Sequence, residues 1–209
     1  MCMYIEETLH RYLDDLASAQ PSPGGGSTAA LSGAMGAALV SMVCRITLAK
    51  QSYISVHPEI EALLSKSEHL RNRFQQLMQE DIEAYGKLAA SYKLPRDTEG
   101  ERKYRSDEIQ KQLVEAAVVP LEVVECAAQL ITFGQRIAEI GSSNILSDVE
   151  TAAILASSSG HGAAFMVRIN VHSIKNATMG AELVVRLNTA LASIVEGVDQ
   201  VKKIVGGRT

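Results

Sequence analysis

Three charged side chains stand at positions where they could take part in proton transfer: Asp81, Asp148 and Lys50. A carboxyl group beside a reacting molecule can take a proton from the attacking atom and return it to the leaving atom. Asp81 lies on or beside the apolar stripe of a long helical pattern, in which Leu77 comes one turn earlier. The alternative is that Ile82 carries this stripe and Asp81 forms its solvated edge. The pattern marks Asp81 as the first candidate for acid–base chemistry and leaves the structural alternative open.

The other two charged candidates also have ordinary structural explanations. Asp148 follows Ser147, and an acidic residue in the first turn of a helix is stabilised by the helix dipole alone. Lys50 continues the direction of Val43 along an apolar helical pattern, and Tyr53 lies on the same side. Lys50 is therefore either the solvated end of a helix or a cation that faces a ligand, with the Tyr53 phenol beside it.

Three consecutive glycines, Gly24, Gly25 and Gly26, precede a helix that Ser27 is expected to cap. Such a run leaves backbone N–H groups open at the positive end of the helix dipole, where an anion or a closely approaching ligand could bind. A flexible turn is the alternative. The run also matches the G-x-G-x-x-A dinucleotide pattern through Ala29, but no strand precedes it and no G-K-S/T sequence follows. We therefore reject the dinucleotide-binding and phosphate-loop interpretations.

The elements that must hold these residues are helical along the whole chain, because apolar residues recur at spacings of three and four. Pro120 is expected to kink or split the fourth helix. Capping boxes begin at Thr98 and Ser147, and Thr178 is expected to cap the last helix. The expected helices cover residues 5–16, 27–50, 58–92, 98–140, 147–174 and 178–205. This pattern predicts an all-α fold, an antiparallel bundle of about six to eight helices in a single domain over residues 1–209.

Two of the expected helices carry rows of small residues, which allow two backbones to approach closely. The rows comprise the small residues that flank Leu31, Met35, Leu39 and Val43 in the first helix, and Ala152, Ala156, Gly160 and Ala164 in the second. The first of these two helices, residues 27–50, has no polar face, so it is expected to be buried at the centre of the bundle. The uncharged stretch of this helix is long enough to cross a membrane, but its small residues favour insertion only weakly. We therefore expect no membrane partner.

Composition and spacing argue against several classes of partner. The 209 residues carry a net charge of −4 and no Trp, and 4% are aromatic, which gives neither a basic patch nor a stacking platform for nucleic acid. The scattered cysteines Cys2, Cys44 and Cys126 have no metal or disulfide spacing, so we expect free thiols in the cytoplasm. His161 and His172 share no ligand spacing, and no metal is expected. The N-terminus lacks the pattern of a signal peptide.

Five blocks of sequence, in order along nearly the whole chain, resemble the cyclodeaminase/cyclohydrolase family of folate enzymes. The first is PSPGGGSTAALSGAMGAALVSMVCRITLAKQSY. The second, DIEAYGKLAASYKLPRDTEGERKYR, is similar to a family pattern D-x-x-A-[FY] followed by K-L-P-x-[DN]-T. The others are VVPLEVVECA, GSSNILSDVETAA and AAFMVRINVHSI. One position departs, because family members often carry Gly-Asn where this chain has Gly141 and Ser142. If that Asn contacts the ligand, its replacement would alter activity or substrate preference.

The resemblance implies chemistry at the carbon that bridges N5 and N10 of tetrahydrofolate. It implies first a formimidoyltetrahydrofolate cyclodeaminase, which releases ammonia and forms 5,10-methenyltetrahydrofolate. The alternative is a 5,10-methenyltetrahydrofolate cyclohydrolase, which opens that ring with water, and a further alternative is a non-catalytic helical dimer. The family also implies a homodimer with its site near the subunit contact and a folate substrate without a tightly bound cofactor. The chain would act either alone or with a separate formiminotransferase.

Under this resemblance Asp81 is the base or stabilises the cationic carbon, and Asp148 and Lys50 are further catalytic candidates. Backbone, hydroxyl, phenol and amide groups are expected to bind the substrate. These substrate-binding candidates are Gly24, Gly25, Gly26, Ser27, Tyr53, Tyr85, Asn144 and Asn170.

Overall fold

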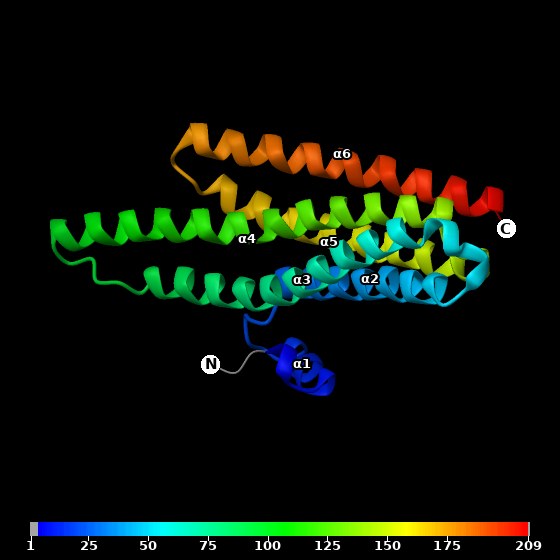
Figure 1. Ribbon diagram of the computed structural model, residues 1–209. Helices are drawn as coiled ribbons and strands as arrows, with labels where there is room; N and C mark the ends of the chain where they lie inside the picture. The colour runs from blue at the N-terminus through cyan, green and yellow to red at the C-terminus, as the bar shows by residue number, and fades with distance from the viewer. Residues whose placement is uncertain (1–3, 209) are drawn as a thin grey trace.

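The computed structural model describes residues 4–208, which form an antiparallel bundle of five long helices preceded by one short helix (Figure 1). The α-helices are α1 (Leu9–Leu16), α2 (Gly25–Leu48), α3 (His57–Ser91), α4 (Glu99–Ile140), α5 (Leu146–His172) and α6 (Ala177–Arg208). Short 3₁₀ helices lie at Tyr4–Glu6, Gln51–Val56 and Ser143–Ile145. No strand occurs among residues 4–208, and successive long helices run in opposite directions, so the predicted all-α bundle is confirmed.

Helices α2 and α5 pack through their small residues, as predicted. Gly36 of α2 lies so close to α5 that an added Cβ would be 3.0 Å from the Ala152 carbonyl oxygen. The Ser32 hydroxyl donates a hydrogen bond to the Leu155 carbonyl at 3.0 Å and ties the two helices together. The expectation that α2 is buried on all sides was wrong, because Met35 in its row of large residues is 48% exposed. The small face of α2 packs inward and part of its large row faces outward.

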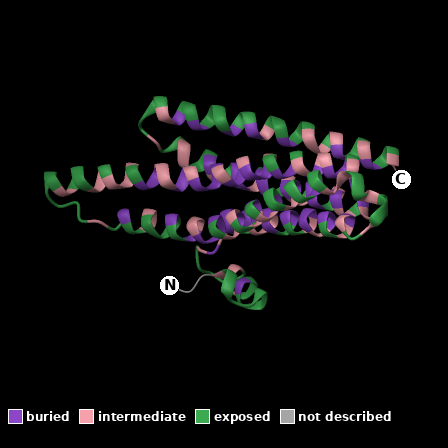
Figure 2. Ribbon diagram, viewed as in Figure 1, coloured by how far each residue is buried: buried purple, intermediate pink, exposed green. Residues whose placement is uncertain are grey.

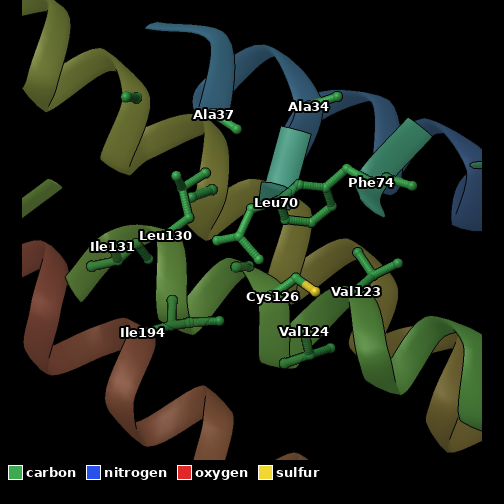
Figure 3. Packing of buried hydrophobic residues seen from close by; sticks show 14 of the residues in the cluster. Ala34, Ala37, Leu70, Phe74, Val123, Val124, Cys126, Leu130, Ile131 and Ile194 are labelled. Carbon is green, nitrogen blue, oxygen red and sulfur yellow. The ribbon is translucent and has the colours of Figure 1, made fainter. Parts of the chain in front are cut away.

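Large side chains of the other helices fill the space that these small residues leave (Figure 3). The Phe74 ring of α3 lies where a Cβ on Gly33 of α2 would stand. Ile194 of α6 occupies the same kind of space over Gly160 of α5. Figure 2 shows the buried residues gathered where the long helices face one another, while the outer face of α6 is exposed. Glycines in α2 and α5 therefore set how closely the neighbouring helices approach.

The ends of the helices lie close to the predicted positions, although some caps differ. The capping box of α4 is confirmed: the Thr98 hydroxyl accepts from the Glu101 N–H at 3.2 Å, and the Glu101 carboxylate accepts from the Thr98 N–H at 2.9 Å. The predicted cap at Ser147 was wrong, because α5 already begins one residue earlier without a side-chain cap. The predicted cap at Thr178 was also wrong, because the Asn176 side chain accepts from the Met179 N–H at the start of α6.

Two further expectations about helix geometry were wrong. Helix α4 continues through Pro120 as one helix, so of the predicted kink or split, the split does not occur. The N-cap of α2 is Gly24 rather than Ser27, which lies inside the first turn. The Ser27 hydroxyl nevertheless accepts a hydrogen bond from the Gly24 N–H at 3.2 Å and donates one to the Gly24 carbonyl at 2.9 Å. Ser27 thus stabilises the helix start from within the helix.

Helices α2, α4 and α6 are long and apolar enough, by length and composition, to cross a membrane. More than half of the apolar window is buried inside the bundle in α2 and in α4, against 28% in α6. Cys44 and Cys126 are free thiols, and burial raises the pKa of each to about 12. Cys2 lies outside the described residues. The expected absence of a membrane partner stays a prediction.

Candidate active site

A cavity of about 350 Å³ lies between the start of α2, the second half of α3, the middle of α4 and the end of α5. Its walls are mainly apolar and include Leu88, Leu113 and Met166. The cavity collects six of the residues that the sequence singled out, which come from three segments of the chain. These six are Gly24, Gly25, Gly26, Asp81, Tyr85 and Asn170.

Asp81 packs directly against the glycine turn at the start of α2. A Cβ on Gly26 would overlap the Asp81 carboxyl group, so only glycine leaves room for it. The backbone N–H of Ser27 donates a hydrogen bond to the Asp81 side chain. The carboxyl group therefore lies at the positive end of the α2 dipole, as an anion at a helix N-terminus does. The glycine run and the acid, which the sequence treated as separate candidates, form one feature.

The ionisation of Asp81 is shifted toward neutral pH. Burial raises the pKa of Asp81 from 3.8 to about 6, because the charged form loses hydration, and the hydrogen bond from the Ser27 N–H opposes part of this rise. Among residues 4–208, Asp81 is the only charged residue that lines the cavity. A carboxyl group with this pKa is present in both protonation states near neutral pH, which suits acid–base chemistry.

Tyr12 of α1 fixes the glycine turn from outside the cavity. Its hydroxyl lies 3.1 Å from the Ser27 hydroxyl and 3.1 Å from the Thr28 hydroxyl. Both of these hydroxyls in turn donate to the Gly24 carbonyl, each at 2.9 Å. Tyr12 is the one buried residue of α1, whereas the apolar Leu9 is 64% exposed. Nothing in the sequence indicates this role of Tyr12, because a Tyr in a short amphipathic helix has many ordinary explanations.

Two further cavity residues were expected to bind substrate. Tyr85 lies at the surface and is 42% exposed, so its phenol borders the cavity rather than filling it. Asn170 of α5 donates hydrogen bonds from Nδ2 to the Ala116 carbonyl at 2.7 Å and to the Met166 carbonyl at 3.0 Å. The bond to Ala116 joins the end of α5 to the middle of α4, the bond to Met166 lies within α5, and together they hold the Asn170 amide in one orientation.

A second polar cluster lies at the opposite end of α2. The Lys50 ammonium donates to the Ser142 hydroxyl at 2.6 Å, and the Tyr53 phenol oxygen accepts from the Ser143 N–H at 3.2 Å. That N–H lowers the pKa of Tyr53, because it stabilises the phenolate. Arg208 donates to the Gly141 carbonyl at 3.0 Å beside this cluster. Ser142 is fully buried here.

The structure does not bring the catalytic candidates together within one chain. Lys50 follows the C-terminus of α2 and Asp148 lies in the first turn of α5, whereas Asp81 packs on the N-terminus of α2. Helix α2 has 24 residues, and at 1.5 Å per residue it separates the two clusters by about 36 Å. Asn144 and Tyr53 belong to the far cluster as well. Among residues 4–208, no group of three His, Cys, Asp or Glu side chains is arranged to hold a metal ion.

Comparisons with known proteins match nearly the whole chain. A family model described as formiminotransferase-cyclodeaminase matches residues 8–189. A methenyltetrahydrofolate cyclohydrolase from Methylorubrum extorquens is 38% identical over 186 residues, which cover 89% of each chain. A formimidoyltransferase-cyclodeaminase from Rattus norvegicus is 30% identical over 80% of this chain, which matches 31% of the length of that protein.

A solved structure agrees with these relatives. The crystal structure of a formiminotetrahydrofolate cyclodeaminase from Thermotoga maritima superposes with a TM-score of 0.88 and 31% identity, covering 97% of this chain and 98% of that one. The resemblance inferred from the five sequence blocks is therefore confirmed. The chain belongs to the formiminotransferase-cyclodeaminase family and is a folate one-carbon enzyme of the cyclodeaminase or cyclohydrolase kind.

Proposed function

We propose that the chain hydrolyses 5,10-methenyltetrahydrofolate, acting at the carbon between N5 and N10. The observation that carries the proposal is the Asp81 carboxyl, with a pKa of about 6, at the glycine turn of an otherwise uncharged cavity. The relative named for this reaction matches 89% of both chains at 38% identity, which favours water as the nucleophile. The sequence resemblance implies ammonia release first, and here that reaction is the second candidate.

In this reaction Asp81 acts on the attacking water. The ionised carboxylate takes one proton from water as the water oxygen bonds to the cationic bridging carbon. The tetrahedral carbon that results carries a hydroxyl group and two nitrogens. The protonated Asp81 then gives its proton to the leaving nitrogen, and the hydroxyl proton passes to solvent as the carbonyl forms. One oxygen is added to the folate and one proton is released overall.

Cyclodeamination of formimidoyltetrahydrofolate is the second candidate, favoured by the structural match to the T. maritima cyclodeaminase. There the folate N10 attacks the formimino carbon, and Asp81 takes the N10 proton and passes it to the departing ammonia. The same carboxyl group serves both reactions, because each passes through a tetrahedral carbon between nitrogens. Both substrates are cationic at the reacting carbon, so an ionised Asp81 stabilises either of them.

We further propose that the chain works as a homodimer in the cytoplasm. Ile154, Phe165 and Ile169 lie along one face of α5 and are 48%, 60% and 64% exposed. Met35 on the adjoining α2 extends this apolar face. A large apolar surface of this kind marks a protein contact. A second copy, related by a twofold axis across α2, would cover this face with the same face of its own.

Such a dimer would also bring the two polar clusters together. A twofold axis perpendicular to α2 makes the α2 helices of the two copies antiparallel. The glycine turn of one copy would then lie toward the Lys50 end of the other. In the described part of the chain the cavity has no cation, with Asp81 as its one charged residue, yet folate ends in a glutamate. Lys50 and Arg208 of the second copy would supply the cations that this tail requires.

The function is tested by two assays run side by side. Loss of the near-ultraviolet band of methenyltetrahydrofolate follows hydrolysis, and ammonia release follows cyclodeamination of the formimidoyl compound. We expect the first to proceed faster than the spontaneous rate and the second to be slow. Ammonia release with only spontaneous decay of the methenyl compound would support the second candidate. Failure of both assays with a folded chain would leave the non-catalytic helical dimer.

The dimer is tested by light scattering in detergent-free buffer. We expect a mass of twice 22.5 kDa at micromolar concentration. Phe165→Glu should give monomers, because it places a charge in the centre of the apolar face, and it should lower kcat/KM for folate. Arg102→Glu, on an exposed stretch of α4, is the matched control and should leave the mass unchanged. A wild-type monomer would contradict the arrangement.

A further inference from the structure

We infer that Pro120, which does not itself line the cavity, is a positioning residue that sets how Asn170 presents its amide to the substrate. Pro120 is buried inside α4, where a helix-interior proline is unfavourable by about 3 kcal/mol. Such a residue calls for an explanation other than helix stability. The inference rests on the proposed folate function and adds to it a residue that positions the binding site from outside the cavity.

Pro120 leaves one carbonyl group of α4 without its helical partner. In a regular helix the N–H of residue 120 donates to the carbonyl of Ala116, four residues earlier. Proline has no N–H, and its ring pushes against that same carbonyl. The Ala116 carbonyl therefore needs another donor, and Asn170 Nδ2 supplies it at 2.7 Å. The two residues are 54 positions apart, so this bond depends on the tertiary fold.

The two hydrogen bonds of Asn170 determine which end of its amide faces the cavity. Both partners, the carbonyls of Ala116 and Met166, accept hydrogen bonds and cannot donate them. The NH₂ group must therefore face the helices, and Oδ1 is the polar atom left for a ligand. No side-chain or backbone group of residues 4–208 donates to Oδ1. Ala116 and Asn170 both line the cavity, which puts the Asn170 side chain at its wall.

An oriented acceptor in an apolar cavity recognises an N–H donor. The reduced pterin ring of a folate carries such donors on its rim, and a buried acceptor discriminates strongly between ligands with and without them. We assign Asn170 Oδ1 as the acceptor for a pterin N–H group. Asp81, on the opposite side of the same cavity, is then left for the reacting carbon. Pro120 acts only through Ala116 and Asn170, which makes the inference testable by a double-mutant cycle.

The test measures the binding of 5-formyltetrahydrofolate, a stable reduced folate, by titration calorimetry. Asn170→Ala should raise Kd about tenfold, the loss expected for a hydrogen bond of about 1.4 kcal/mol. Pro120→Ala restores an N–H that competes for the Ala116 carbonyl and should raise Kd about threefold to tenfold. The melting temperature of Pro120→Ala should stay level or rise, because alanine suits a helix better. Val118→Ala, two residues earlier in α4 and outside the cavity, is the matched control.

The double variant separates a positioning role from a general structural role. If Pro120 acts through Asn170, Pro120→Ala should have no further effect on Kd in the Asn170→Ala background. Additive effects, or an unchanged Kd in Asn170→Ala, would overturn the inference while wild-type turnover of folate left the proposed function intact. If the wild-type chain neither turns over nor binds folate, the proposed function fails, and the substrate assigned to Asn170 fails with it.

Discussion

Replacing Asp81 by Asn removes a charge from the cavity while preserving its shape. The Asn oxygen can still accept the hydrogen bond from the Ser27 N–H. Folding at neutral pH forces the wild-type carboxylate to lose hydration, and its pKa rises from 3.8 to about 6. At 1.36 kcal/mol per pKa unit, the charged form destabilises the fold by at most about 3 kcal/mol. Asp81→Asn should therefore stabilise the protein, by up to about 6–12 °C in Tm for a chain of this size.

The sign of this effect depends on pH. The folded state holds the Asp81 proton more tightly than the unfolded state, so wild-type stability falls as pH rises from about 4 to about 6. Below this window Asp81 is neutral in both states and the difference in Tm between variant and wild type should vanish. Above it the difference should reach a constant maximum. Thermal unfolding of both proteins at a series of pH values from 4 to 8 measures the curve.

Activity should move in the opposite direction to stability. Loss of a general acid–base group typically lowers turnover by about a hundredfold to ten-thousandfold. The assay is the decay of methenyltetrahydrofolate at saturating substrate, with Glu83→Gln on the exposed face of the same helix as the control. Wild-type turnover in Asp81→Asn, or a Tm difference that does not depend on pH, would refute the reasoning. The search for the base would then turn to Asp148 and Lys50.

The remaining predictions concern the glycine turn and the far cluster. Gly26→Ala should reduce turnover at least tenfold, because its Cβ displaces the Asp81 carboxyl. Gly86→Ala in α3 should fold and act normally, since its Cβ would meet nothing within 4 Å. Equal activity in the two variants would contradict this account. Lys50→Met should raise KM for folate and leave kcat nearly unchanged, because Lys50 lies about 36 Å from Asp81 in its own chain and can contribute only through a second copy. A fall in kcat as large as that of Asp81→Asn would contradict this role.

The long helices were predictable because their signals are local. Apolar spacing, Pro58 near a helix start and the box at Thr98 each act within a turn or two of the chain, and all three agree with the structure. The caps at Ser147 and Thr178 failed for a related reason. Several polar residues stand near each of those helix starts, and the tertiary path of the loop decides which of them meets the first N–H groups.

The candidate site was only partly predictable, because its parts meet through the tertiary fold. The sequence supplied Asp81 and the glycine run, but their direct packing depends on how α3 crosses the start of α2. The link from Asn170 to Ala116 could not be read from spacing, since nothing local connects positions 54 residues apart. Lys50 was grouped with Asp81 because helical periodicity shows on which face of a helix a residue lies. It does not show how far apart two residues lie along the bundle axis. Its place at the far end follows from the length of α2.

The attachment of α1 links the cavity to a short helix outside the main bundle. Helix α1 has eight residues and one buried side chain, Tyr12, so we expect its detachment to expose little apolar surface and to be among the less costly openings of the fold. Each detachment takes the Tyr12 hydroxyl away from the residues that hold the glycine turn. A ligand that binds the ordered turn must therefore favour the attached helix, by the reciprocity of linked equilibria. Amide exchange or proteolysis in α1 should slow when the cavity fills, and α1 would report on a cavity that it does not line.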